Sequence, residues 1–283
     1  MQDILSVALR ALSFLFLLQA AGVALFLAIF GRLLASSADA IRGLGRWSAR
    51  VGLAFVAAHY ALEAARMAGE FSGIWDLSLQ RTALRSGGAA FGVRVLGLSL
   101  VALSLRRVDA GALVLGVVGT AIAVAAFILV GHTAVHPQRW ILAPLLMLHL
   151  LIVAFWLGAL LPLYLASLRE SPEISTTLVN AFSRLATWLV PGILVAGVAL
   201  AILLVPSIGV FAQPYGWLLL TKVALFAGLM GLASLNKWRL GPALGRGDHR
   251  GGLGFRRSLL SEYVLIFVVL TVTAVMTTFF SPE

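Results

Sequence analysis

The sequence predicts an all-α integral membrane protein, a single domain over residues 1–283 built as a bundle of eight transmembrane helices. Of its residues, 61% are hydrophobic and only 11% are charged, and the mean hydropathy is +1.02. Soluble domains are typically about 45–50% apolar and about 25% charged. The apolar residues also gather in blocks that reach the roughly 20 residues a spanning helix needs. The bilayer is therefore the expected solvent of most of the chain.

Eight apolar blocks are long enough to cross the membrane. They cover residues 4–31, 46–68, 88–106, 110–131, 139–168, 180–206, 214–238 and 256–280. Pro144, Pro162 and Pro191 lie inside blocks, where each removes a backbone donor and can bend its helix. The connection at 68–87 mixes charges with aromatic residues, which predicts a short amphipathic segment on the membrane surface.

The net charge of +10 is spread between apolar blocks, which indicates loops facing anionic lipid and no nucleic-acid partner. The connections after the first, third, fifth and seventh blocks hold 14 of the 21 basic residues. These are Arg32, Arg42, Arg46, Arg50, Arg106, Arg107, Arg169, Arg184, Lys237, Arg239, Arg246, Arg250, Arg256 and Arg257. The positive-inside bias therefore predicts that both termini lie outside the cytoplasm.

Three of the five histidines, His132, His136 and His149, fall within residues 131–156. Imidazole is costly in hydrocarbon unless it finds partners, and it is the commonest metal ligand. On a helix, the i,i+4 spacing of His132 and His136 would place both rings on one face at the outer mouth. His149 would lie near mid-membrane. The alternative is that His132 and His136 only cap a spanning segment at the water interface.

A second candidate set is His59 with Glu63, again at i,i+4, and the thioether of Met147. Because the chain has no cysteine, imidazole, thioether and carboxylate are the expected protein ligands. This set favours a copper ion, Cu⁺ or Cu²⁺, over zinc or iron–sulfur chemistry. Alternatively, the His59–Glu63 pair fixes helix packing and Met147 fills space.

Four further polar or aromatic residues inside apolar blocks are candidates for either function or packing: Trp156, Lys222, Asn236 and Glu262. Trp156 follows His149 by seven residues and so shares its helix face. By contrast, His249 lies in a Gly- and Arg-rich run that predicts a flexible, solvated loop. No hydrolase motif, phosphate loop or nucleotide fingerprint occurs, so we expect no enzyme activity.

Several short stretches together resemble the CopD family of copper-resistance inner-membrane proteins. They are GHTA (131–134), LHLLIVAFWLGALLPLYL (148–165), FSRLA (182–186), YGWLLLTKVALF (215–226), the region of Asn236, and RRSLLSE (256–262). The resemblance implies copper transport across the bacterial inner membrane, generally import from periplasm to cytoplasm, with a periplasmic carrier of the CopC type as partner. Where the family often has Gly-Gly, this chain has Gly158-Ala159.

Two other functions are consistent with the same residues. His59 and His149 on separate helices are possible axial ligands of a membrane b-type haem. Alternatively, the chain is a copper-homeostasis or assembly factor that transports nothing. No energy-coupling module is present in the sequence, so transport would be passive or proton-coupled.

Overall fold

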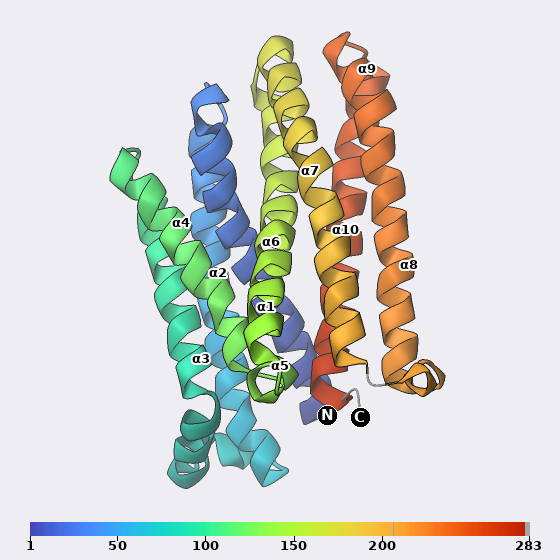
Figure 1. Cartoon of the computed structure of the whole chain (residues 1–283). Helices are drawn as coiled ribbons and strands as arrows, with labels where there is room; N and C mark the ends of the chain where they lie inside the picture. Colours follow the sequence, from blue (N-terminus) through green and yellow to red (C-terminus); the bar gives the residue numbers. More distant parts are fainter. Residues whose placement is uncertain (206, 281–283) are drawn as a thin grey trace.

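The computed structural model describes residues 1–205 and 207–280, with the side chains of all of these except His132 and Thr133. The described residues form helices and no strands, which confirms the predicted fold class. Eight long helices lie side by side in one bundle (Figure 1). They are α1 (Gln2–Phe30), α2 (Ala38–Ala68), α3 (Leu77–Ser104), α4 (Ala110–Ala125), α6 (Arg139–Arg169), α7 (Pro172–Leu204), α8 (Pro214–Leu235) and α10 (His249–Phe279).

Seven of the described helical segments are long and apolar enough to cross a membrane. The exception among the eight long helices is α2. Its charged residues, from Asp39 to Arg66, are spread along its length and lower its hydropathy. It nevertheless runs beside α1 and α3 within the bundle (Figure 1).

Several helices begin earlier than their apolar blocks, because capping residues decide where a helix starts. α3 begins at Leu77, where the Asp76 carboxylate accepts hydrogen bonds from the backbone N–H of Ser78 and Leu79, at 2.8 and 3.3 Å. The surface segment predicted at 68–87 is therefore only a short 3-10 helix, η2 (Phe71–Trp75), followed by the first turns of α3. The prediction for His249 was also wrong: this residue begins α10, capped by Asp248.

The chain crosses the bundle back and forth, and both termini lie at the same end (Figure 1). We call this the terminal end; it also carries the α2–α3, α4–α6 and α7–α8 connections. The opposite end carries the other connections, and most of the basic residues lie in them or in the adjoining parts of the helices, so we call it the basic end. At the centre, α1 packs against α2, α3, α4, α6 and α10.

The helices α1 and α6 approach each other closely at a pair of glycines. A Cβ atom added to Gly22 would lie 1.8 Å from the carbonyl oxygen of Ala154, and one added to Gly158 would lie 2.3 Å from the carbonyl carbon of Gly22. The two backbones therefore touch, which only glycine permits. This contact fixes the position of α6, the helix that carries His149 and Trp156.

Candidate functional site

His149 is half-buried on α6 and faces α7. Its Nδ1 lies 3.3 Å from the carbonyl oxygen of Ile193. Because a carbonyl only accepts, Nδ1 must carry the hydrogen in this bond, which leaves a lone pair on Nε2. Gly197, one turn further along α7, lies under the ring: a Cβ there would be 3.6 Å from Cε1 of His149. The ring is thus held in one orientation, and its Nε2 takes no part in the hydrogen bond to Ile193.

Two other predicted residues lie near His149. Met147 is partly buried and packs against the hydrophobic core. It precedes His149 by two residues, so the two side chains leave α6 on different sides. Lys222, half-buried on α8, is within electrostatic range of the His149 ring. Its ammonium group has no recorded hydrogen bond within the described part of the chain.

His136 does not share a helix with His132, contrary to the prediction from their spacing. The short helix α5 (His132–Val135) ends one residue before His136, because Pro137 disfavours helical backbone at the residue before it. The half-buried His136 accepts a hydrogen bond at Nδ1 from the backbone N–H of Gln138, at 3.1 Å. The side chain of His132 lies outside the described residues, so the structure does not place the second ring.

His59 is engaged by an arginine. Arg10 Nε donates to His59 Nε2 at 3.2 Å, so that nitrogen is an acceptor and Nδ1 carries the hydrogen of the neutral ring. Neither nitrogen is free for a metal in this arrangement. Arg10 Nη1 also donates to the carbonyl oxygen of Thr277 at 2.7 Å. One guanidinium therefore joins α1, α2 and α10.

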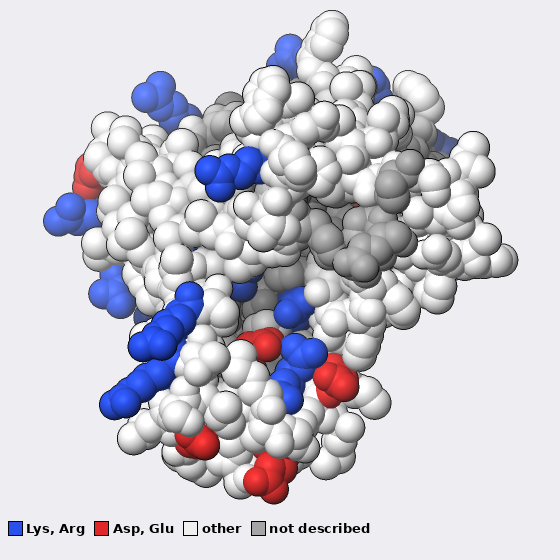
Figure 2. Space-filling view, turned by 60° about the horizontal axis from the view of Figure 1, so that its bottom comes forward, with Lys and Arg blue, Asp and Glu red and all other residues white. Residues whose placement is uncertain are grey.

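Glu63 belongs to the same group of charges. Its carboxylate lies 3.6 Å from His59 Nε2 and 3.9 Å from Arg10 Nη2. Arg66 binds it at 3.2 Å and binds Asp3 at 3.1 Å. We call Asp3, Arg10, His59, Glu63 and Arg66 the terminal cluster. Acidic and basic side chains are intermixed on this end of the molecule (Figure 2).

A third arrangement joins Trp156, Asn236 and Glu262, from α6, the end of α8 and α10. Trp156 Nε1 donates to one carboxylate oxygen of Glu262 at 3.0 Å, and Asn236 Nδ2 donates to the other. Glu262 is 2% exposed. The buried Oδ1 of Asn236 has no partner among the described residues. We call these three residues the Glu262 cluster.

The Glu262 cluster coincides with an irregular turn. Asn236 begins a π-helical segment, η5 (Asn236–Leu240), which continues α8. Single π-turns inside helices are frequent at functional sites. No cationic side chain forms an ion pair with Glu262 in the described residues. The sequence singled out all three members of this cluster, but not their contact with one another.

The described side chains contain no group of three or more His, Asp and Glu that could hold one metal ion. His59 contacts α1, and His149 contacts α7, and no contact between these two possible haem ligands is recorded among the described residues.

Two buried polar residues escaped the sequence analysis. Gln19 on α1 is 1% exposed, and neither of its amide atoms has a partner among the described residues. Arg94 on α3 has its guanidinium carbon 5.0 Å from the ring centroid of Phe127, a cation–π distance. Each is a polar residue within an apolar block, and this position in the sequence could have marked both as candidates.

The fold and these three groups define a polytopic membrane protein with ionisable side chains inside its helix bundle. In a comparison with protein-family models, residues 1–138 match the copper resistance protein D-like N-terminal domain, and residues 176–276 match copper resistance protein D. The chain belongs to the copper resistance protein D family. This confirms the resemblance, and the match includes the first half, where the sequence agreed mainly in its pattern of spans. Neither curated proteins nor solved structures gave a match.

Proposed function

We propose that this protein carries copper across the bacterial inner membrane, from periplasm to cytoplasm, and that His149 is a ligand inside the bundle. The orientation of the His149 ring supports this most directly. Metal-binding histidines commonly donate one ring N–H to a carbonyl or carboxylate, which fixes the tautomer that ligates. The Nδ1–H of His149 donates to Ile193 in this way. The thioether of Met147, a soft donor that suits Cu⁺, would serve the neighbouring position along α6.

In this proposal the terminal end is periplasmic. Most of the basic residues lie in the loops of the basic end or in the adjoining parts of the helices, and the cytoplasmic side of a membrane protein carries such an excess. His136, with His132, then lies where an ion would arrive from a separate CopC-type carrier. Reporter fusions test the orientation: fusions after Arg107 should report the cytoplasm, and fusions after Gln138 the periplasm. The reverse pattern would move the entrance to the other side.

The proposed route continues from His149 past Lys222 to the Glu262 cluster. Lys222 lies near the His149 ring, and its amine, when charged, would oppose a long stay of a cation there. The Glu262 carboxylate, held by Trp156 and Asn236, offers the next negative group. His59 and Glu63 are engaged by Arg10 and Arg66, so we assign these two candidate ligands a position beside the route.

Copper accumulation by cells expressing single variants tests this route. His149→Ala should abolish uptake at every copper concentration, because a dehydrated cation in low dielectric needs its protein ligands. His136→Ala should instead weaken the apparent affinity and leave substantial uptake at high copper, since water can replace a ligand at the mouth. Copper content is measured across a concentration series and normalised to the amount of protein in the membrane.

A matched control is His249→Ala, which removes an imidazole at the basic end and should leave uptake unchanged. If His149→Ala accumulates copper as the parent does, His149 has a packing role only. If the parent itself accumulates no more copper than cells lacking it, the transport function is wrong.

A further inference from the structure

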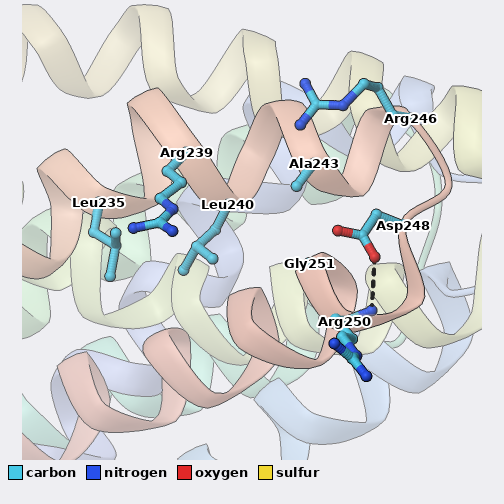
Figure 3. Close-up of a pocket in the computed structure, with 8 residues that line it drawn as sticks. All are labelled: Leu235, Arg239, Leu240, Ala243, Arg246, Asp248, Arg250 and Gly251. Carbon is cyan, nitrogen blue, oxygen red and sulfur yellow. Dashed lines mark hydrogen bonds between the residues drawn. The ribbon is translucent and has the colours of Figure 1, made fainter.

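An open pocket lies at the connection between α8 and α10, at the basic end (Figure 3). After η5, the chain forms the short helix α9 (Gly241–Gly245) and reverses through Gly247, whose φ of 73° favours glycine. It then enters α10 at His249. The pocket has a volume of about 400 Å³. It lies between α9 and the first turn of α10.

Three arginines from three different segments line this pocket: Arg239 from η5, Arg246 from the turn, and Arg250 from α10. Within residues 1–205 and 207–280, no hydrogen bond or ion pair is recorded for any of their guanidinium groups. The one carboxylate of the lining, Asp248, accepts the backbone N–H of Arg250 at 3.0 Å (Figure 3). Asp248 therefore serves as the cap of α10, and the pocket keeps an excess of positive charge.

Such an arrangement fits a phosphate group. The planar guanidinium offers paired N–H donors that match phosphate oxygens. By contrast, Arg256, which lies on α10 like Arg250, already donates to the carbonyl oxygen of Ser167, at 3.4 Å. The arginines of the pocket thus differ from a nearby arginine in having donors left to offer.

The pocket is also continuous with apolar surface. Leu235 and Leu240 contribute to its lining, and Leu235 is exposed on the outside of the bundle as well. Trp238, 73% exposed, lies in the same segment, and tryptophan is typical of the membrane interface. A soluble anion would use only the arginines, whereas an amphiphile would use both kinds of surface.

We propose that this pocket binds the phosphate of an anionic phospholipid, with Arg239, Arg246 and Arg250 on the headgroup and the acyl chains along α8. Basic pockets between membrane helices on the cytoplasmic side are a known setting for such headgroups. The packing partners of α8 are α10 and its own flanking segments. A lipid held by arginines of η5, the turn and α10 therefore joins the two arms of the α8–α10 hairpin and stabilises it. The cytoplasmic placement of this pocket rests on the orientation proposed above.

The test uses the purified full chain in mixed micelles containing equal amounts of phosphatidylglycerol and phosphatidylcholine, with retained lipid counted by native mass spectrometry. The site variant combines Arg239→Gln, Arg246→Gln and Arg250→Gln. The matched control combines Arg32→Gln, Arg106→Gln and Arg107→Gln, which removes the same charge from exposed arginines at the same end. Parent and control should retain phosphatidylglycerol preferentially, and the site variant should retain about tenfold less.

Three results would overturn the proposal. The two triple variants could lose phosphatidylglycerol equally, which would mean that the whole charged surface attracts it. The folded parent could retain no phosphatidylglycerol. Inorganic phosphate, added at matched concentration, could displace the lipid from the parent, which would assign the pocket to a soluble anion. If the site variant fails to insert, Arg239→Gln and Arg246→Gln are measured singly, and each should show a partial loss that Arg106→Gln does not.

Discussion

The terminal cluster and the Glu262 cluster both place a carboxylate inside the bundle, but they compensate its charge differently. Glu63 of the terminal cluster lies within 4 Å of two guanidinium groups, those of Arg10 and Arg66. Glu262 has only the uncharged donors of Trp156 and Asn236. Glu63 is also partly exposed, whereas Glu262 is 2% exposed.

This difference separates a group that holds helices together from a group that can take up a cation. In the terminal cluster the negative charge is already paired, so a further cation gains little there. A buried carboxylate without a cationic partner is costly in low dielectric. Glu262 therefore favours whatever supplies positive charge, either a proton or the transported ion. We expect the chemistry of transport to involve the Glu262 cluster and to leave the terminal cluster unchanged.

The largest expected difference between the two clusters appears when the charge of Glu262 and the charge of Glu63 are each removed in a separate variant. Glu262→Gln should reduce copper uptake by about tenfold or more, where each tenfold corresponds to about 1.4 kcal/mol in the barrier. The variant should still fold, because the Gln Oε1 can accept from Trp156, and the Gln Nε2 can donate to the unpartnered Oδ1 of Asn236 once the Asn236 amide turns over. Glu63→Gln should leave uptake per folded protein within about twofold of the parent.

Uptake measured at several pH values sharpens this comparison. If Glu262 carries a proton during transport, the parent should show a pH dependence that Glu262→Gln lacks and Glu63→Gln keeps. Equal losses of uptake in the two variants would show that charge compensation does not distinguish the clusters. Unchanged uptake in Glu262→Gln would remove Glu262 from the route.

A smaller effect, on stability, is expected at Arg10. Arg10→Gln leaves the half-buried His59 ring without its donor, and leaving a buried polar group unsatisfied costs about 1–3 kcal/mol. The bond to the carbonyl oxygen of Thr277 lies at an exposed position and adds less. The thermal unfolding midpoint of the purified protein should fall, while copper uptake per folded molecule stays the same. Arg85→Gln is the control, because that exposed side chain on α3 makes no recorded hydrogen bond. Lost uptake with retained stability would place the terminal cluster on the route.

The helix bundle was predictable from the sequence, because apolar blocks of spanning length leave few alternatives. The members of the Glu262 cluster were predictable too, as lone polar residues in such blocks. Their contacts were not, since Trp156 and Glu262 are 106 positions apart. Periodicity within one helix gives the buried face but not the partner on another helix.

Other differences arose where local signals, and not apolar content, decide where a helix begins or ends. Pro137 follows His136 directly and ends α5 before it, so the i,i+4 spacing of the histidines does not describe one helix. Asp248 caps α10 and brings His249 into the helix. The engagement of His59 by Arg10 spans 49 positions.

A third carboxylate, Glu170 at the end of α6, combines features of both clusters. It accepts hydrogen bonds from the Ser37 hydroxyl and from the backbone N–H of Ala35, Ser36 and Ser37, at 2.5 to 3.1 Å. Like Glu262 it has only uncharged donors, but it lies at the basic end, close to water. Burial opposes its ionisation, yet these hydrogen bonds outweigh burial and hold the pKa of Glu170 below its ordinary value of 4.5. Glu170 thus ties the α1–α2 loop to the end of α6.

The smallest expected effect is the pH dependence of stability that Glu170 contributes. Because folding lowers its pKa, the contribution is complete above pH 4.5 and is lost as the pH falls below 4.5 through the folded-state pKa. Unfolding midpoints measured from neutral pH down to pH 3 should therefore fall less steeply below 4.5 in Glu170→Gln than in the parent. Glu70→Gln, at an exposed carboxylate without a recorded hydrogen bond, should follow the parent. Parallel curves for the parent and Glu170→Gln would show that uncharged donors do not stabilise this carboxylate, and would weaken the same argument for the bonds that Trp156 and Asn236 make to Glu262.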